Sequence, residues 1–173
     1  TDNSGRDIAA QIFYGARISL LIGLAAMALA ISIGGILGAL AGFYGGLADD
    51  ILMRITEAFQ TLPNFLLLLM LVAVFGSTLT TVTIAIGLVS WQAPARLTRA
   101  EFLSLRTREF VQAGRTIGLS DATLIFREIL PNAWPPLIVE ASLRVTYAIL
   151  LGSALSFLGL GAQPPSSDWG LMI

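Results

Sequence analysis

Long uncharged hydrophobic stretches alternate with short polar segments along this chain. No charged residue occurs between Arg17 and Asp49, and none occurs between Glu57 and Arg96. About 20 helical residues are enough to cross the hydrocarbon layer of a bilayer, so stretches of this length predict membrane-spanning helices. A very apolar soluble core is the alternative interpretation, and the length of the stretches argues against it.

The same pattern predicts four spans, and therefore an all-α, polytopic transmembrane helix bundle. Glycine commonly ends a helix and proline interrupts one. We expect Gly45 and Gly46 to end the first span, Asp49 or Asp50 to cap the second, and Pro63 to kink it. The spans are expected over about residues 18–43, 51–75, 79–91 and 134–157.

Small residues recur at every fourth position of the first span. The set comprises Ala26, Ala30, Gly34, Gly38 and Gly42. At this spacing they form a smooth stripe on one helix face, against which another backbone can approach closely. We therefore predict that the three glycines pack against a neighbouring helix.

The charged residues are few and unevenly placed. They make up 12 % of the 173 residues, against about 25 % in a typical soluble domain. Six of the ten arginines lie in residues 96–127. Arginine beside a span stays on the cytoplasmic side, so this segment should be cytoplasmic. Counting spans backwards then leaves residues 1–16 outside the cytoplasm.

Several residue types with characteristic chemistry are absent from the sequence. It contains no cysteine, histidine or lysine. This excludes thiol nucleophiles, Ser-His-type triads, the usual zinc-ligand sets and a phosphate-binding loop with its lysine. We therefore expect no enzymatic activity and no metal site in this chain, and nothing in it indicates nucleic-acid binding. Any energy source for its activity should reside on another chain.

The cytoplasmic segment 109–131 has the pattern of two short helices. Residues 109–117 have helical spacing, and Gly118 should break the helix because glycine adopts a left-handed backbone. Ser120 or Asp121 is a suitable N-cap for a second helix over 122–130, which Pro131 should end. Two short helices joined at a glycine would make segment 109–131 a compact knob. This knob could dock in a groove of a partner, or it could lie on the lipid surface. The pattern alone does not decide between these two.

A resemblance favours docking. The stretch VQAGRTIGLSD at residues 111–121, followed by ILPN at 129–132, resembles the EAA loop of ABC-importer permeases. In that family the loop carries the coupling helix that sits in a cleft of the ATPase subunit. Gln112 stands where the family usually has glutamate, and Gly114 where it has the second alanine. By resemblance the coupling residues are Phe110, Gln112, Ala113, Gly114, Arg115, Gly118, Leu119, Ser120 and Asp121.

Further motifs extend the resemblance over nearly the whole chain. They are similar to segments of the C-type permease subunit of dipeptide, oligopeptide and nickel importers. Those permeases typically have six spans, so residues 1–173 are expected to form one transmembrane domain that lacks the first and last span. The motifs are GRD at 5–7, GARISL at 15–20, AGFYGG at 41–46, LSFLGLG at 155–161, QPP at 163–165 and WG at 169–170.

The resemblance implies a function and a set of partners. The chain would be a permease subunit of an ATP-driven importer for short peptides or similar small solutes, in a bacterial inner membrane. Its partners would be a second, homologous permease, two ATP-binding subunits that hold ATP and magnesium, and an extracytoplasmic solute-binding protein, which loop 159–169 could contact. No cofactor would be bound by this chain itself. The alternative function is a passive channel that needs no ATPase.

One acid–base pair stands apart from these motifs. Glu140 and Arg144 are four residues apart on the last expected span, in the order that suits an intrahelical ion pair. Charged residues within a span usually face a cavity or a partner helix. A role in lining the translocation pathway and a purely structural role both remain open, and the transported solute is not determined by these residues.

Overall fold

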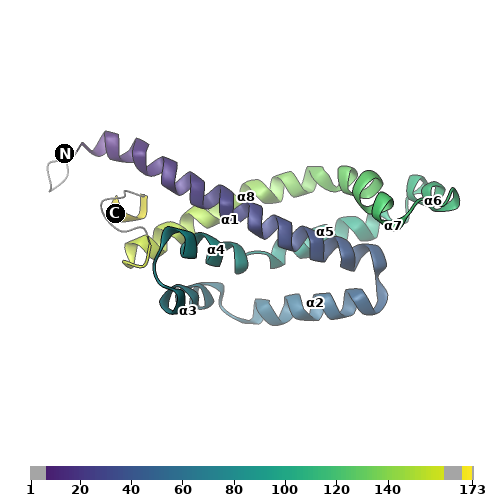
Figure 1. Ribbon diagram of the computed structural model, residues 1–173, viewed down its shortest axis with the longest axis horizontal. Helices are drawn as coiled ribbons and strands as arrows, with labels where there is room; N and C mark the ends of the chain where they lie inside the picture. The colour runs from purple at the N-terminus through teal and green to yellow at the C-terminus, as the bar shows by residue number, and fades with distance from the viewer. Residues whose placement is uncertain (1–6, 162–168, 173) are drawn as a thin grey trace. The chain divides into compact units, whose positions relative to one another are not determined.

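The computed structural model describes residues 7–161 and 169–172, in which every regular element is a helix (Figure 1). The motifs at residues 5–6 and 163–165, and most of loop 159–169, lie outside the described residues. The elements in chain order are α1 Ile8–Tyr44, α2 Gly46–Thr61, α3 Asn64–Phe75, α4 Leu79–Leu88, α5 Gln92–Leu105, α6 Glu109–Thr116, α7 Asp121–Thr123, the π-helical turn η1 Leu124–Ile129, α8 Leu130–Phe157 and the 3₁₀ turn η2 Trp169–Met172.

Two helices in the described part of the chain are long and apolar enough to cross a membrane. They are Ile8–Tyr44 and the continuous helix Asp121–Phe157, each 37 residues long. A third candidate is the pair α2 and α3, which is bent by 82° at the break between them. The expected all-α membrane architecture is therefore present, with two or three candidate spans where the sequence pattern suggested four.

The difference lies at residues 79–91, which we expected to form the third span. Helix α4 has only 10 residues, about 15 Å at a rise of 1.5 Å per residue, which is half the thickness of the hydrocarbon layer. It begins at Leu79, after the N-cap residue Thr78, whose hydroxyl accepts a hydrogen bond from the amide of Thr81. It stops at Leu88, and α5 starts anew after Trp91.

Other helix boundaries also depart from the expectations. Helix α1 starts at Ile8, ten residues before the expected start, and it ends at Tyr44 as predicted. Helix α2 begins at Gly46 with no side-chain cap, so neither Asp49 nor Asp50 caps it. Pro63 does more than kink a helix, because the helix is interrupted there and α3 starts in a new direction after α2.

The chain divides into two compact units. Unit 1 comprises Thr1–Leu29, Pro63–Val89 and Leu143–Ile173. Its core is aliphatic and draws on α1, α3, α4 and α8, with Leu68, Ile86 and Leu155 fully buried. In the same unit, η2 is joined to α1 because the indole N–H of Trp169 donates to the carbonyl oxygen of Ile12 at 3.2 Å.

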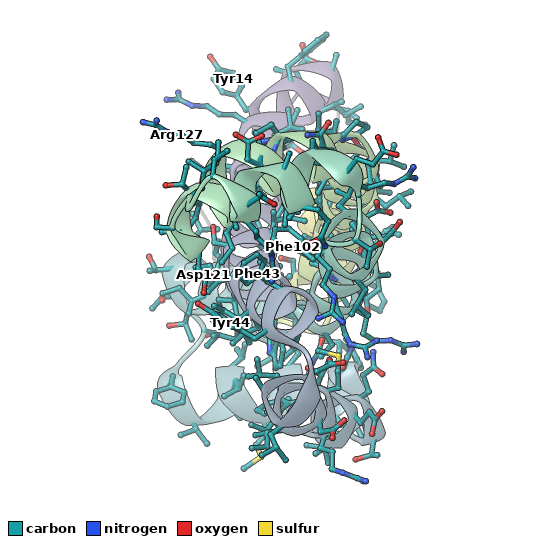
Figure 2. All side chains as sticks on the ribbon, turned by 90° about the vertical axis from the view of Figure 1, so that its right-hand side faces the viewer. Tyr14, Phe43, Tyr44, Phe102, Asp121 and Arg127 are labelled. Atoms are coloured by element: carbon teal, nitrogen blue, oxygen red, sulfur yellow. The ribbon has the colours of Figure 1, made fainter. Side chains whose placement is uncertain are left out.

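Unit 2 comprises Ala30–Leu62 and Ser90–Ser142. Its core includes Phe43 from α1, Phe102 from α5 and Val111 from α6, together with Leu124 and Ile129 from η1. Figure 2 shows Phe43 and Phe102 in the interior of this unit.

The glycine stripe of α1 packs against α5, as the sequence predicts. A Cβ atom on Gly34 would lie 2.7 Å from the Cβ of Pro94, and one on Gly38 would lie 2.7 Å from the Cβ of Thr98. A Cβ on Gly42 would lie 2.6 Å from the Cβ of Phe102. All three distances are too short for real carbon atoms, so only glycine lets the two backbones come this close.

This packing yields a matched pair of substitutions in the full-length protein. We expect Gly38→Ala to destabilise the fold by about 1–3 kcal/mol, the usual cost of overpacking a tight contact. Gly35→Ala is the control, because a Cβ there meets nothing within 4 Å, and it should be neutral or slightly stabilising. Thermal unfolding in detergent measures both. Equal melting temperatures for the two variants would contradict the close α1–α5 contact.

Candidate functional site

The segment that links α6 to η1 forms a closed turn at one end of unit 2 (Figure 1). Gly118 has a φ of +80°, the left-handed conformation predicted for it. The amide of Gly118 donates to the carbonyl of Arg115, and the amide of Leu119 donates to that of Gly114, each at 3.0 Å. These two bonds form a Schellman motif, which satisfies the last carbonyls of α6.

Ser120 starts the next helix, as expected. Its hydroxyl accepts a hydrogen bond from the amide of Thr123 at 3.3 Å and lies 2.9 Å from the hydroxyl of the same residue. Asp121 occupies the first helical turn, where a carboxylate interacts favourably with the helix dipole. The turn between the two helices is therefore closed by a cap on each side.

The second helix of the knob does not end where the sequence suggests. Pro131 was expected to stop it, but the helix continues without a break to Phe157. A proline within a helix collides with the carbonyl four residues earlier, here that of Arg127. Arg127 lies in η1, a wider π-helical turn in which the amide of Leu130 donates to Ile125, five residues back. This wider turn accommodates the proline, so the knob is continuous with α8.

Helix α6 has two apolar faces. Val111 and Gly114 form the inner one, both buried. A Cβ on Gly114 would lie 2.8 Å from a methyl group of Leu124, so a larger residue would force that side chain to shift. The outer face carries Phe110 and Ala113 and continues to Ile117, the C-cap residue that directly follows α6, with 37 % of Phe110 and 76 % of Ile117 exposed. The spacing i, i+3, i+7 places these three side chains in one stripe.

Polar contacts fasten α6 to the end of α1. The guanidinium of Arg115 lies 5.3 Å from the ring centroid of Phe43, within the range of a cation–π interaction. Arg106, at the end of α5, donates from Nη1 to the carbonyl of Phe43 at 3.3 Å. Gln112 donates to the carbonyl of Arg106 at 3.3 Å. Phe43 thus connects α1, α5 and α6, a role that the motif AGFYGG at residues 41–46 did not indicate.

Asp49 has a partner that the sequence did not indicate. The Nε and Nη2 atoms of Arg99 donate to the two carboxylate oxygens of Asp49, which makes a bidentate ion pair between α2 and α5. The hydrogen bond to Asp49 raises the pKa of Arg99. The two residues are 50 positions apart, so only the fold brings them together.

The remaining predicted residues lie elsewhere on the fold. Glu140 and Arg144 are partly buried on α8, and the guanidinium of Arg144 lies 5.4 Å from the ring centroid of Tyr147. Arg127 projects outward from η1 (Figure 2). Within residues 7–161 and 169–172, no three acidic, histidine or cysteine side chains are grouped to hold a metal ion.

Comparison with known families matches residues 34–173 to the family described as "Binding-protein-dependent transport system inner membrane component". Among individual proteins, the chain is 43 % identical over 173 residues to the di/tripeptide transport system permease protein of Pseudomonas aeruginosa, covering all of this chain and 57 % of that protein. It is 41 % identical over 172 residues to the glutathione transport system permease protein of Pectobacterium atrosepticum, covering 99 % of this chain and 57 % of that protein.

A third relative is the oligopeptide transport system permease protein of Haemophilus influenzae, 41 % identical with coverage of 100 % of this chain and 56 % of that protein. The chain therefore spans rather more than half the length of these relatives. Among solved structures, a chain of the MetNI methionine ABC transporter in inward-facing conformations has the same fold. Its TM-score is 0.74 at 19 % identity, and the match covers 91 % of this chain and 76 % of that one.

The turn at Gly118 can be tested with a matched pair of variants. Gly118→Val should destabilise the turn by about 1–2 kcal/mol, because a β-branched residue resists a left-handed backbone. Gly118→Asn is the control, since asparagine tolerates that conformation. Limited trypsin digestion of the full-length protein in membranes, followed at Arg115 by mass spectrometry, should cleave the valine variant faster. Equal cleavage rates would show that the left-handed turn does not hold the segment together.

Proposed function

Because this chain belongs to the binding-protein-dependent transport system inner membrane component family, we propose that it is the permease subunit of an ATP-driven importer. It would form part of the translocation pathway for short peptides or similar small solutes. The observation that carries the proposal is the outer face of α6, an exposed apolar stripe on a helix whose inner face is packed and capped.

An exposed stripe of this kind suits a groove on a partner protein. An amphipathic helix docks by placing apolar side chains at i, i+3 and i+7 into such a groove. Phe110, Ala113 and Ile117 have this spacing and point away from the core of unit 2. We assign the groove to an ATP-binding subunit, and Gln112, Ser120 and Asp121 would border the contact.

The contacts of α6 with η1 and α1 would transmit motion of a docked partner into this chain. Val111 and Gly114 pack on η1, which continues into α8, and Arg115 stacks on Phe43 at the end of α1. Motion of the ATP-binding subunits would therefore push on both long apolar helices at once. Such a push could tilt them between inward-facing and outward-facing arrangements, as in other transporters.

The complete assembly would contain partners beyond this chain. We propose a second, homologous permease subunit, two ATP-binding subunits that carry ATP and magnesium, and an extracytoplasmic solute-binding protein. The chain would cross the bacterial inner membrane several times as one transmembrane domain, with segment 109–131 on the cytoplasmic side. Glu140 and Arg144 would line the pathway. Short peptides are the preferred solute class because relatives are named for di/tripeptides, oligopeptides and glutathione.

Site-specific crosslinking tests the partner. The described chain has no cysteine, so a single cysteine at Ser120 in a cysteine-free full-length permease is a unique attachment point. In native membranes we expect a thiol crosslinker to capture an ATP-binding subunit, with a yield that changes when ATP is added. Thr80→Cys is the control, because Thr80 is exposed on α4 and far from segment 109–131 in sequence.

Crosslinking only to lipid, or to nothing, in correctly inserted protein would argue for a membrane-surface role of α6. That result would also favour the alternative function of a passive channel, which no present observation supports.

A substitution on the outer stripe tests the docking face itself. Ile117→Asp should lower ATP-dependent uptake by about tenfold, because a few apolar residues carry most of the binding energy of an interface and a tenfold change corresponds to about 1.4 kcal/mol. Thr107→Asp serves as control, since it adds the same charge at an exposed position just before α6. Uptake into proteoliposomes measures the effect, with the amount of inserted permease checked in each case. Normal uptake by the Ile117 variant would place the docking face elsewhere.

A further inference from the structure

Helices α2 and α5 leave a groove of about 800 Å³ between them, entirely within unit 2. Pockets for small molecules usually have volumes of about 300–1,000 Å³. Five charged side chains line this groove. They are Asp50, Arg54, Glu57, Arg96 and Arg99.

The two sides of α2 differ sharply in chemistry. The groove side carries the charged residues, whereas Ile51, Ile55 and Leu62 are exposed and do not line the groove. Charged side chains within membrane-spanning segments normally face a water-filled cavity or a partner, because lipid cannot solvate them. With α3, α2 forms a pair bent by 82° that is either a broken span or a re-entrant loop. This distribution indicates that the groove side of α2 meets water and that the opposite side meets lipid or another subunit.

The charges of the groove are balanced. Arg99 is held by the carboxylate of Asp49, which lies behind the groove, so this guanidinium is already neutralised. Arg96 donates one N–H to the side-chain oxygen of Gln60 at 3.1 Å and keeps further donors. Within the described residues, two guanidinium groups, on Arg54 and Arg96, and two carboxylates, on Asp50 and Glu57, then face the same space.

We propose that this groove is a water-filled section of the solute path and that it takes small zwitterionic molecules. A guanidinium binds a carboxylate through charge-assisted hydrogen bonds, and a carboxylate binds an ammonium group in the same way. A free short peptide carries both groups, one at each end. The proposal rests on the function proposed above, and it adds the chemical feature of the solute that this chain recognises.

Cysteine labelling in the reconstituted full-length transporter tests whether the groove is open. Ala93→Cys places the thiol on the groove wall, and Ala58→Cys places the same thiol on an exposed part of α2 that does not line the groove. A water-soluble thiol reagent should modify the groove position about tenfold faster, a difference equivalent to 1.4 kcal/mol.

Protection from labelling tests the ligand chemistry. Saturating dialanine, which is zwitterionic, should slow modification at Ala93→Cys, whereas N-acetyl-dialanine amide, which lacks both charges, should not. Arg96→Gln should weaken the protection by dialanine about tenfold, through loss of a charged hydrogen-bond donor. Arg17→Gln is the matched control, because Arg17 is an exposed arginine that does not line the groove.

Three results would overturn the proposal. An unreactive Ala93→Cys in a transporter that still drives ATP-dependent uptake would show that another helix of the assembly fills the groove. Equal protection by the two peptides would show that the charged termini are not recognised. Absence of ATP-dependent uptake by the cysteine-free parent would contradict the proposed function itself, and this separate assay distinguishes the two failures.

Discussion

The close approach of α1 and α5 is the contact on which unit 2 depends. Backbone meets backbone along Gly34, Gly38 and Gly42, with no space for a Cβ atom. In a membrane, where apolar side chains gain little by leaving lipid for each other, such tight packing is a main source of helix association. Because α5 is held there, Arg99 can reach Asp49 on α2, and Arg106 can reach the end of α1.

Two further helices of unit 2 are attached to this pair, α2 to α5 and α6 to α1. On one side, α2 is tied to α5 by a bidentate ion pair and leaves a charged groove beside it. In addition, Arg115 of α6 makes a cation–π contact with Phe43 at the end of α1. This contact holds α6 against α1 and leaves the outer apolar stripe exposed. The proposed docking surface and the proposed solute groove thus rest on the same pair of helices, α1 and α5.

The differences between expectation and structure have specific physical causes. Pro131 was expected to end a helix because it lacks an amide hydrogen, but the π-helical turn before it removes the carbonyl clash. Residues 79–91 looked like a span because they are uncharged, yet α4 stops at Leu88 and α5 begins after Trp91. Asp49 was expected to cap α2, but the helix already begins at Gly46, and the carboxylate of Asp49 instead pairs with Arg99.

By itself the sequence determined the features that depend on neighbouring residues or on solvent preference. These are the apolar helices, the left-handed turn at Gly118 and the cap at Ser120, since each follows from local backbone preference or from the absence of charge. Only the tertiary structure decided the partner of Asp49, the contact of Arg115 with Phe43, and which face of α6 stays open. The two contacts join residues dozens of positions apart in the sequence. A local sequence pattern does not specify which distant side chains become neighbours in the fold.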